Sequence, residues 1–215
     1  MENGDWRKHR AAHLKGFAGT PGLAGIGAAM PAYGEVAHLS AEQRGAVAAA
    51  FGTVPQRVLN DVDAAQIGAF AGGPGILILA GTGSMAWARD AAGKSYRVGG
   101  WGETIGDEGS GYWIGRHVLG LVSQSLDGRA APTRLVDAVF KALKLDPADP
   151  VNGLEGWVSR LTHPRSEISA LAASCGQAAE AGDAGAVAIL EEAADELARH
   201  FRAIARLAGA ALPWS

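Results

Sequence analysis

The sequence contains only one cysteine, Cys175, in 215 residues. A single thiol cannot form a disulfide framework, a thiolate zinc site or a cysteine-ligated iron–sulfur cluster within one chain. No apolar stretch approaches the roughly 20 residues that a membrane-spanning helix needs, and the short run Ile76–Ala80 is typical of a buried strand instead. These absences predict a reducing, cytoplasmic setting and no membrane partner.

An excess of charge of one sign is also lacking. The 19 basic and 22 acidic residues give a formal net charge of −3, so we expect no nucleic-acid partner. The first residues, Met1–Lys15, are polar and basic and lack the apolar core of a secretory signal. We expect a solvated terminal segment there.

Glycine, in contrast, is abundant: the chain has 31, about twice the average usage. The glycines gather in three stretches, Gly16–Gly34, Gly72–Gly83 and Gly93–Gly115, each next to apolar runs. Glycine at the end of a strand usually marks a tight turn or a close approach of the backbone to a ligand. These stretches are therefore the first places to seek binding loops.

Hydrophobic periodicity predicts an α/β chain that is helical in its C-terminal third. A capping-box pattern at Ser40–Gln43 predicts a helix that ends at Phe51. The other expected elements are strands at Gln56–Asn60 and Ile76–Ala80, a hairpin of Met85–Arg89 and Ser95–Val98, helices at Val62–Ala71 and Tyr112–Leu126, and only helices after Thr133. The breaker cluster Gly72–Gly75 predicts a boundary between a shorter part, residues 1–74, and a longer one, residues 75–215.

The last helix has the clearest pattern of all. Asp183 is a good N-cap residue at its start. Apolar residues follow at a spacing of three or four, namely Val187, Leu190, Ala194, Leu197, Phe201, Ile204 and Leu207. This stripe predicts the packed face of the helix.

The strand at Ile76–Ala80 runs directly into Gly81-Thr82-Gly83-Ser84. Backbone N–H groups freed from the strand ladder form an anion-binding concavity, to which the two hydroxyls add donors. Such a turn suits the terminal phosphates of a nucleotide, although the Gly-Lys-Ser/Thr of a Walker-type loop does not follow. A plain tight turn before a hairpin is the alternative.

A second glycine-rich segment, GGWGETIGDEGS, occupies Gly99–Ser110. Trp101 lies there among glycines, and an aromatic ring in such a loop can pack on a sugar while amides and a carboxylate bind hydroxyls. Asp107 and Glu108 precede a helix, where the helix dipole favours acidic residues as caps. A ligand site and a structural cap both stay open on these residues alone.

Asn60 and Asp61 stand at the C-terminal end of a predicted strand, the side at which ligands bind in parallel α/β sheets. A carboxylate there can accept a proton from a hydroxyl that attacks phosphorus. An N-cap for the next helix is the alternative, and Asp63 competes for the catalytic role.

In this order, the strand-end aspartate, the GTGS turn and the run GWGETIGDEGSGYWIGR resemble the N-acetylglucosamine kinases and the wider BadF/BadG/BcrA/BcrD-type ATPase family, within the actin/hexokinase/Hsp70-like superfamily. The similarity is dense over Asn60–Gly115 and thinner over Leu23–Asn60. It implies part of a ribonuclease-H-like (actin-like ATPase) two-lobe α/β fold. Residues 1–74 would be a remnant of the N-terminal lobe, and residues 75–215 an incomplete C-terminal lobe.

The resemblance also implies roles for individual residues. It makes Asp61 the base that deprotonates the 6-hydroxyl of an amino sugar, N-acetylglucosamine or glucosamine. It assigns the ATP phosphates to Gly81, Thr82, Gly83 and Ser84, and the sugar to Gly100, Trp101, Gly102 and Asp107. Glu108 would support the loop rather than touch the ligand. ATP with Mg²⁺ is the implied cofactor, no protein ligand of the metal is assigned, and a homodimer stays open.

Two motifs of the family have no counterpart. Nothing in Met1–Gly34 matches its first phosphate loop, Asp-Gly-Gly-Gly-Thr, and no adenosine-binding Gly-Gly turn precedes Ser215. Each lost donor at the phosphates typically costs about 3–4 kcal/mol in the transition state, so we expect a truncated or decayed homologue, weakly active or inactive alone. A non-catalytic sugar-binding remnant is the main alternative. The single cysteine disfavours an iron–sulfur electron-donating activator of the same family.

Overall fold

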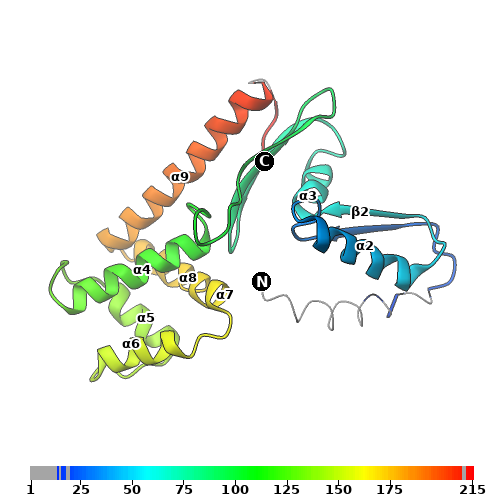
Figure 1. Cartoon of the computed structure of the whole chain (residues 1–215). Helices are drawn as coiled ribbons and strands as arrows, with labels where there is room; N and C mark the ends of the chain where they lie inside the picture. Colours follow the sequence, from blue (N-terminus) through cyan, green and yellow to red (C-terminus); the bar gives the residue numbers. More distant parts are fainter. Residues whose placement is uncertain (1–13, 15, 18–19, 210–211) are drawn as a thin grey trace. The chain divides into compact units, whose positions relative to one another are not determined.

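The computed structural model describes residues 14, 16–17, 20–209 and 212–215. The chain divides into two compact units, Met1–Gly73 and Pro74–Ser215, one residue before the boundary that the sequence predicted (Figure 1). The solvated segment expected at Met1–Lys15 lies outside the described part, apart from Leu14. In that part, no helix is both long and apolar enough to cross a membrane.

The first unit is built on two parallel strands joined by a helix. Its elements are β1 (Ile26–Met30), α2 (Ala37–Phe51), β2 (Gln56–Asn60) and α3 (Asp61–Ala69). The strands pair along their whole length, and parallel neighbours need such a crossover connection. Their small core consists of Ala28, Met30, Val47 and Phe51. Asn60 and Asp61 therefore lie at the carboxyl end of a parallel pair, as the sequence predicted.

The start of α2 differs from the prediction. The helix begins at Ala37, and its N-cap residue Val36 makes no side-chain cap bond. The Ser40 hydroxyl donates to the Val36 carbonyl (2.9 Å) and accepts from the Gly34 N–H (2.8 Å). The capping-box prediction was wrong because Ser40 bonds backward to the preceding turn. The predicted end at Phe51 is confirmed.

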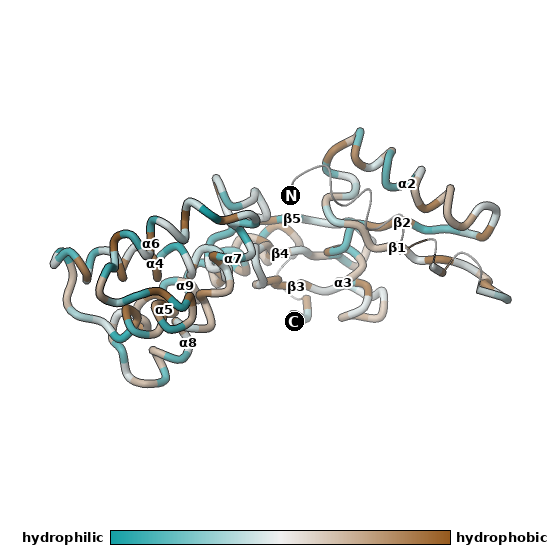
Figure 2. Tube along the Cα trace, turned by 90° about the horizontal axis from the view of Figure 1, so that it is seen from below, coloured by the Kyte–Doolittle hydropathy of each residue, from teal (hydrophilic) through white to brown (hydrophobic). Residues whose placement is uncertain are grey.

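The second unit opens with an antiparallel sheet. Its strands lie in chain order, β3 (Gly75–Ala80), β4 (Ser84–Arg89) and β5 (Ser95–Gly99). The predicted hairpin is confirmed, and Gly93 has the left-handed φ of +82° that its turn favours. Trp214 forms a parallel bridge with Ile76, whose N–H donates to the Pro213 carbonyl (2.8 Å). Residues 212–215 thus lie along the outer edge of β3, where only helices had been expected (Figure 2).

Helices make up most of the rest of this unit. They are α4 (Gly111–Leu126), α5 (Leu135–Leu143), α6 (Pro150–Ser159), α7 (Pro164–Ser169), α8 (Ala172–Glu180) and α9 (Ala184–Ala208). The helices α4 to α8 gather at one end of the sheet, and α9 runs back along it (Figure 1, Figure 2). Their core includes Val118, Leu135, Cys175 and Ala186. Burial raises the pKa of the Cys175 thiol to about 11, so this thiol stays protonated and unreactive near neutral pH.

The packed face of α9 agrees with the predicted stripe in part, since Ile204 is buried and Leu190 and Phe201 pack against the core. Asp183 caps the helix, as expected. The buried residues are Ala186, Ile189, Ala193, His200 and Ile204. The predicted Leu207 is instead 56% exposed. Small and polar residues take the contact positions because the backbone approaches α9 closely at Gly99 and Gly109; a Cβ on Gly109 would lie 2.5 Å from the Ala193 carbonyl oxygen.

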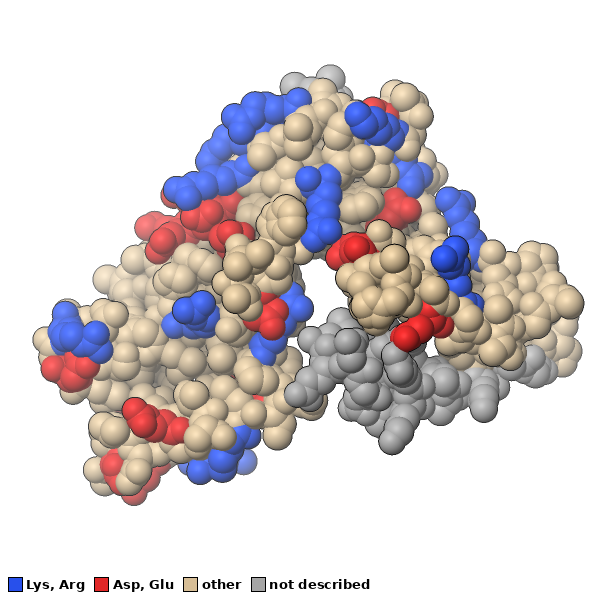
Figure 3. All heavy atoms as spheres, in the orientation of Figure 1, with Lys and Arg blue, Asp and Glu red and all other residues tan. Residues whose placement is uncertain are grey.

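Charge is graded along the exposed side of α9. Its earlier half carries Glu191, Glu192, Asp195 and Glu196, and its later half carries Arg199, Arg202 and Arg206. Figure 3 shows the acidic and basic groups following one another on this helix. Of these residues only Arg206 lies in the last turn, where a cation interacts favourably with the helix dipole.

The packing of α4 against α7 can be tested by substitution of Gly115 in α4. A Cβ there would overlap the carbonyl of Ile168 in α7, a backbone group that cannot move aside alone. We expect Gly115→Ala to lower the free energy of unfolding by about 1–3 kcal/mol, the usual cost of overpacking. Gly120→Ala, in the same helix with nothing within 4 Å, is the control and should be neutral or stabilising by about 0.5–1 kcal/mol. Urea unfolding followed by circular dichroism measures both, and equal stability of the two variants contradicts the packing.

Candidate functional site

Two segments of the second unit meet beside its sheet. The GTGS turn, Gly81–Ser84, links β3 to β4, and the tryptophan loop, residues 100–110, links β5 to α4. Ser84 joins them, since its N–H donates to Asp107 Oδ1 (3.3 Å) and its hydroxyl to the Glu108 carbonyl (2.6 Å). Segments that the sequence assigned to different ligands are therefore tied together by hydrogen bonds.

The first turn of α4 holds the GTGS turn in place. The Gly111 N–H donates to the Gly81 carbonyl (2.8 Å), and the Tyr112 N–H donates to the Thr82 carbonyl (3.2 Å). In a trans peptide the C=O of one residue and the N–H of the next point in opposite directions, so the N–H groups of Thr82 and Gly83 point away from α4. Within the described residues neither N–H has a protein acceptor. The turn thus offers two adjacent donors of the kind that an anion site needs.

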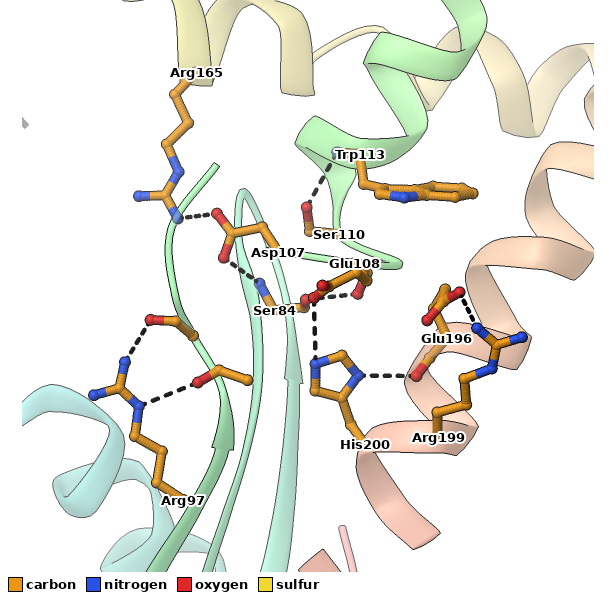
Figure 4. A network of polar contacts seen from close by, with 12 residues as sticks. Ser84, Arg97, Asp107, Glu108, Ser110, Trp113, Arg165, Glu196, Arg199 and His200 are labelled. Carbon is orange, nitrogen blue, oxygen red and sulfur yellow. Dashed lines mark hydrogen bonds and ion pairs between the residues drawn. The ribbon is translucent and has the colours of Figure 1, made fainter. Parts of the chain in front are cut away.

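Asp107 is the buried centre of the tryptophan loop. It is 1% exposed and has φ +61°, a left-handed conformation that is uncommon outside glycine. One carboxylate oxygen accepts from Ser84, and the other forms an ion pair with Arg165 of α7, with 2.6 Å between Nη2 and Oδ2 (Figure 4). Both oxygens are therefore engaged within the protein.

Trp101 projects from the loop and is 68% exposed. The flanking Gly100 and Gly102 have φ of +72° and +84°, which glycine reaches without strain. The Arg97 guanidinium lies 5.5 Å from the centre of the indole ring and donates to the carbonyls of Gly99 and Gly100. The ring is held by a cation and still exposed, which is the arrangement that a stacking platform needs.

Glu108 faces α9. The Nε2 atom of His200 lies 3.7 Å from Glu108 Oε2, and its Nδ1 atom lies 2.8 Å from the Glu196 carbonyl oxygen (Figure 4). Because a carbonyl only accepts, Nδ1 carries a proton in that contact. The imidazole packs on Gly99, where a Cβ would overlap it. Glu108 and His200 thus connect the loop to α9 through a contact that is an ion pair only when His200 is protonated.

In the first unit, Asn60 and Asp61 have separate tasks. The Asn60 side chain accepts from the Val62 N–H (2.9 Å) as the cap of α3 and donates to the Tyr33 carbonyl (3.0 Å). Asp61 is exposed, and one of its oxygens also accepts from Val62 (3.0 Å). The buried Asn60 supplies the main cap, and the Asp61 carboxylate stays accessible. Asp63 is half-buried within α3.

Sequence reasoning missed Arg165 and His200. Both come from helices far along the chain from the loop that they contact; Arg165 and Asp107 are 58 residues apart. No local spacing connects such residues. The only available signal was the acidic pair Asp107 and Glu108, which needs counter-charges from elsewhere when it is buried.

Comparison with known sequences gives consistent matches. A model of the BadF/BadG/BcrA/BcrD ATPase family matches residues 14–211. The chain is 36% identical over 147 residues to an N-acetylmuramic acid/N-acetylglucosamine kinase of Clostridium acetobutylicum, over 68% of this chain and 47% of that protein. It is 32% identical over 124 residues to an N-acetyl-D-glucosamine kinase of Dictyostelium discoideum, over 57% of this chain and 38% of that protein. The chain spans less than half the length of these curated relatives.

Solved structures give the same picture of the fold. A candidate N-acetylglucosamine kinase of Chromobacterium violaceum matches with a TM-score of 0.68 and 27% identity, over 86% of this chain and 65% of that one. A candidate N-acetylglucosamine kinase of Porphyromonas gingivalis also matches with a TM-score of 0.68, at 20% identity, over 97% of this chain and 69% of that one. The predicted α/β fold of the actin-like ATPases is confirmed.

Gly83 is the point at which the GTGS turn touches the Asp107–Arg165 pair. A Cβ there would overlap Arg165 Nη2 and lie 2.8 Å from Asp107 Oδ1, whereas a Cβ on Gly81 would meet nothing within 4 Å. We expect Gly83→Ala to lower the free energy of unfolding by about 1–3 kcal/mol, because Arg165 is tied to its carboxylate and cannot swing away freely. Gly81→Ala is the control, with an expected change below about 0.5 kcal/mol. If thermal unfolding finds both variants equally stable, the contact at Gly83 is refuted.

Proposed function

Because the chain belongs to the BadF/BadG/BcrA/BcrD ATPase family, we propose that it serves in the transfer of phosphate from ATP to an amino sugar. The proposed substrate is N-acetylglucosamine, which the names of both relatives include, or glucosamine, and the proposed acceptor is the 6-hydroxyl. The observation that carries this proposal is the junction at Ser84, which ties the GTGS turn to the tryptophan loop. We place the protein in the cytoplasm because its single, buried thiol suits a reducing compartment.

The GTGS turn is the proposed phosphate site. Its free N–H groups at Thr82 and Gly83 would donate to terminal phosphate oxygens, and the exposed Thr82 hydroxyl adds a third donor. Gly81 closes the turn, because its N–H donates to the Gly83 carbonyl (2.9 Å). Ser84 takes part through the backbone, because its hydroxyl is buried and already donates to Glu108.

The proposal includes Mg²⁺ as an ion held by the phosphates of the nucleotide. The described residues contain no group of three or more His, Cys, Asp or Glu side chains that could hold a metal ion. Mg²⁺ commonly keeps several waters and binds through substrate phosphates with one or two carboxylates, and the phosphates would hold it here. The chemistry that it would supply there is neutralisation of phosphate charge.

The tryptophan loop is the proposed sugar site. The exposed Trp101 ring offers a face for the apolar side of a pyranose, and the flanking Gly100 and Gly102 keep side chains away from it. An ionised carboxylate has about four acceptor positions, of which Ser84 and Arg165 use two on Asp107. Because this side chain is 2% exposed, Asp107 would serve the proposed sugar site by holding the loop in place.

Asp61 is the proposed catalytic base. As the sugar 6-hydroxyl attacks the γ-phosphorus of ATP, the new O–P bond forms, the bond from phosphorus to the β–γ bridging oxygen breaks, and ADP leaves. The hydroxyl proton passes to the accessible Asp61 carboxylate. Most of the acceleration in such a transfer comes from positioning and charge stabilisation.

A non-catalytic sugar-binding function is the second candidate. The observation in its favour is that the tryptophan loop is anchored from β5, α7 and α9 within the second unit alone. Titration calorimetry with N-acetylglucosamine, glucosamine and ATP in separate experiments distinguishes the two candidates. The kinase predicts binding of a sugar and of ATP, followed by formation of a sugar phosphate. Sugar binding without ATP binding selects the second candidate, and binding of neither removes both.

The base assignment predicts a specific loss. Asp61→Asn should remove at least about 99% of turnover, because general-base catalysis is typically worth a factor of 100 or more. Sugar affinity should stay within a few-fold, since the amide keeps the shape of the carboxylate. Asp63→Asn is the matched control and should keep most of its activity. An Asp61→Asn variant that retains a tenth of the turnover would shift the assignment to Asp63.

Substitution of Trp101 should weaken sugar binding more than it lowers the stability of the protein. Trp101→Ala removes an exposed ring, so we expect the sugar dissociation constant to rise about tenfold or more while the melting temperature moves little. Trp214→Ala removes another exposed tryptophan, 70% accessible, and should leave sugar binding unchanged. Calorimetry and thermal unfolding report the two effects separately. A loss confined to thermal stability would mean that Trp101 is a packing residue.

A further inference from the structure

Arg165 is the only cation that the described residues place against Asp107. It belongs to α7, and the position of this helix is dictated by α4. A Cβ on Gly111 would lie 2.6 Å from Ser169 Oγ, and one on Gly115 would overlap the Ile168 carbonyl. The same helix α4 holds the GTGS turn through its first amides. Helix α4 thus positions both Arg165, through α7, and the GTGS turn.

The guanidinium is bound unequally by two carboxylates. Its Nη2 donates to Asp107 Oδ2 at 2.6 Å, a hydrogen-bonded ion pair with a side chain that is 2% exposed. Its Nε lies 3.4 Å from Glu103 Oε2 and is buried without an aligned hydrogen bond. The contact with Asp107 is therefore the stronger of the two.

The net charge around Arg165 indicates whether its guanidinium could bind phosphate directly. One guanidinium faces two carboxylates, so the cluster carries no surplus positive charge with which to attract phosphate. Arg165 is consequently poorly suited to bind ATP directly. Any effect of Arg165 on ligand binding must therefore pass through the residues that it contacts. These belong to both joined segments: Asp107 in the tryptophan loop, by an ion pair, and Gly83 in the GTGS turn, by close contact.

We propose that Arg165 is a positioning residue that couples occupancy of the GTGS turn to sugar binding at the tryptophan loop. This inference rests on the proposed function. One Asp107 oxygen holds Ser84 of the turn, and the other holds Arg165. A ligand that orders the turn therefore orders Asp107, and with it the loop that carries Trp101. The path is a continuous set of packed and hydrogen-bonded groups with a ligand site at each end.

The decisive measurement is the effect of one ligand on the affinity for the other. For the full chain, calorimetry gives the dissociation constant of N-acetylglucosamine with and without a non-hydrolysable ATP analogue and Mg²⁺. We expect the analogue to tighten sugar binding about fivefold or more. Arg165→Ala should reduce this factor to nearly one. Arg165→Lys, which keeps a charge near Asp107 but not the planar fork, should restore part of it.

Two variants separate positioning from simple stabilisation. Arg129→Ala removes another Arg–Asp pair with the same 2.6 Å distance, but at the surface, where the side chains are 63% and 49% exposed. It should leave the coupling factor unchanged. Glu103→Gln removes only the weaker partner of Arg165 and should reduce the factor less than Arg165→Ala does. A merely structural Arg165 would weaken both ligands and keep the coupling factor intact, and that result overturns the proposal.

Hydrogen exchange separates this proposal from the proposed function. If the wild-type chain binds neither ligand, the proposed function fails, but Arg165→Ala should still speed amide exchange at Ser84 and throughout residues 100–110. Faster exchange at both segments supports the structural link. Unchanged exchange at either segment overturns it, as does a wild-type chain that binds both ligands without any coupling.

Discussion

The buried carboxylate of Asp107 is the interaction on which the second unit's site depends. A charge that is 1% exposed is costly unless it is paired and hydrogen-bonded. Asp107 meets that requirement with two partners from distant parts of the chain, the Ser84 amide and the Arg165 guanidinium. The need to satisfy one buried charge therefore fixes a strand end, a loop and a helix relative to one another, and it holds Asp107 itself at an uncommon positive φ.

Several glycines of the second unit lie where segments approach one another closely. Gly83 leaves room for the Asp107–Arg165 pair, Gly109 for the backbone of α9, and Gly111 and Gly115 for α7. These glycines serve close approach between segments rather than flexibility. The loop is consequently packed from several sides, and the exposed Trp101 stands on a rigid base.

Local signals carried most of the successful predictions. The strand before Asp61 and the hairpin around Gly93 were predicted because their patterns lie within a few residues. Two buried positions of α9, Ala193 and His200, were missed because apolar periodicity assumes bulky contacts, whereas the backbone approaches α9 closely at Gly99 and Gly109. Tertiary contacts between residues far apart in sequence, such as that of Arg165, leave no periodic trace.

The same ion pair reduces an electrostatic conflict in the proposed site. Three acidic residues of the tryptophan loop, Glu103, Asp107 and Glu108, lie in the segment hydrogen-bonded to the GTGS turn, and carboxylates repel the phosphates of a nucleotide. Arg165 offsets one of the first two charges, and Glu108 is directed toward His200 on α9. The ion pair thus lowers the negative charge that the loop places beside the proposed phosphate site. Arg165, which touches both segments, is for that reason as integral to the site as the residues that would contact the ligands.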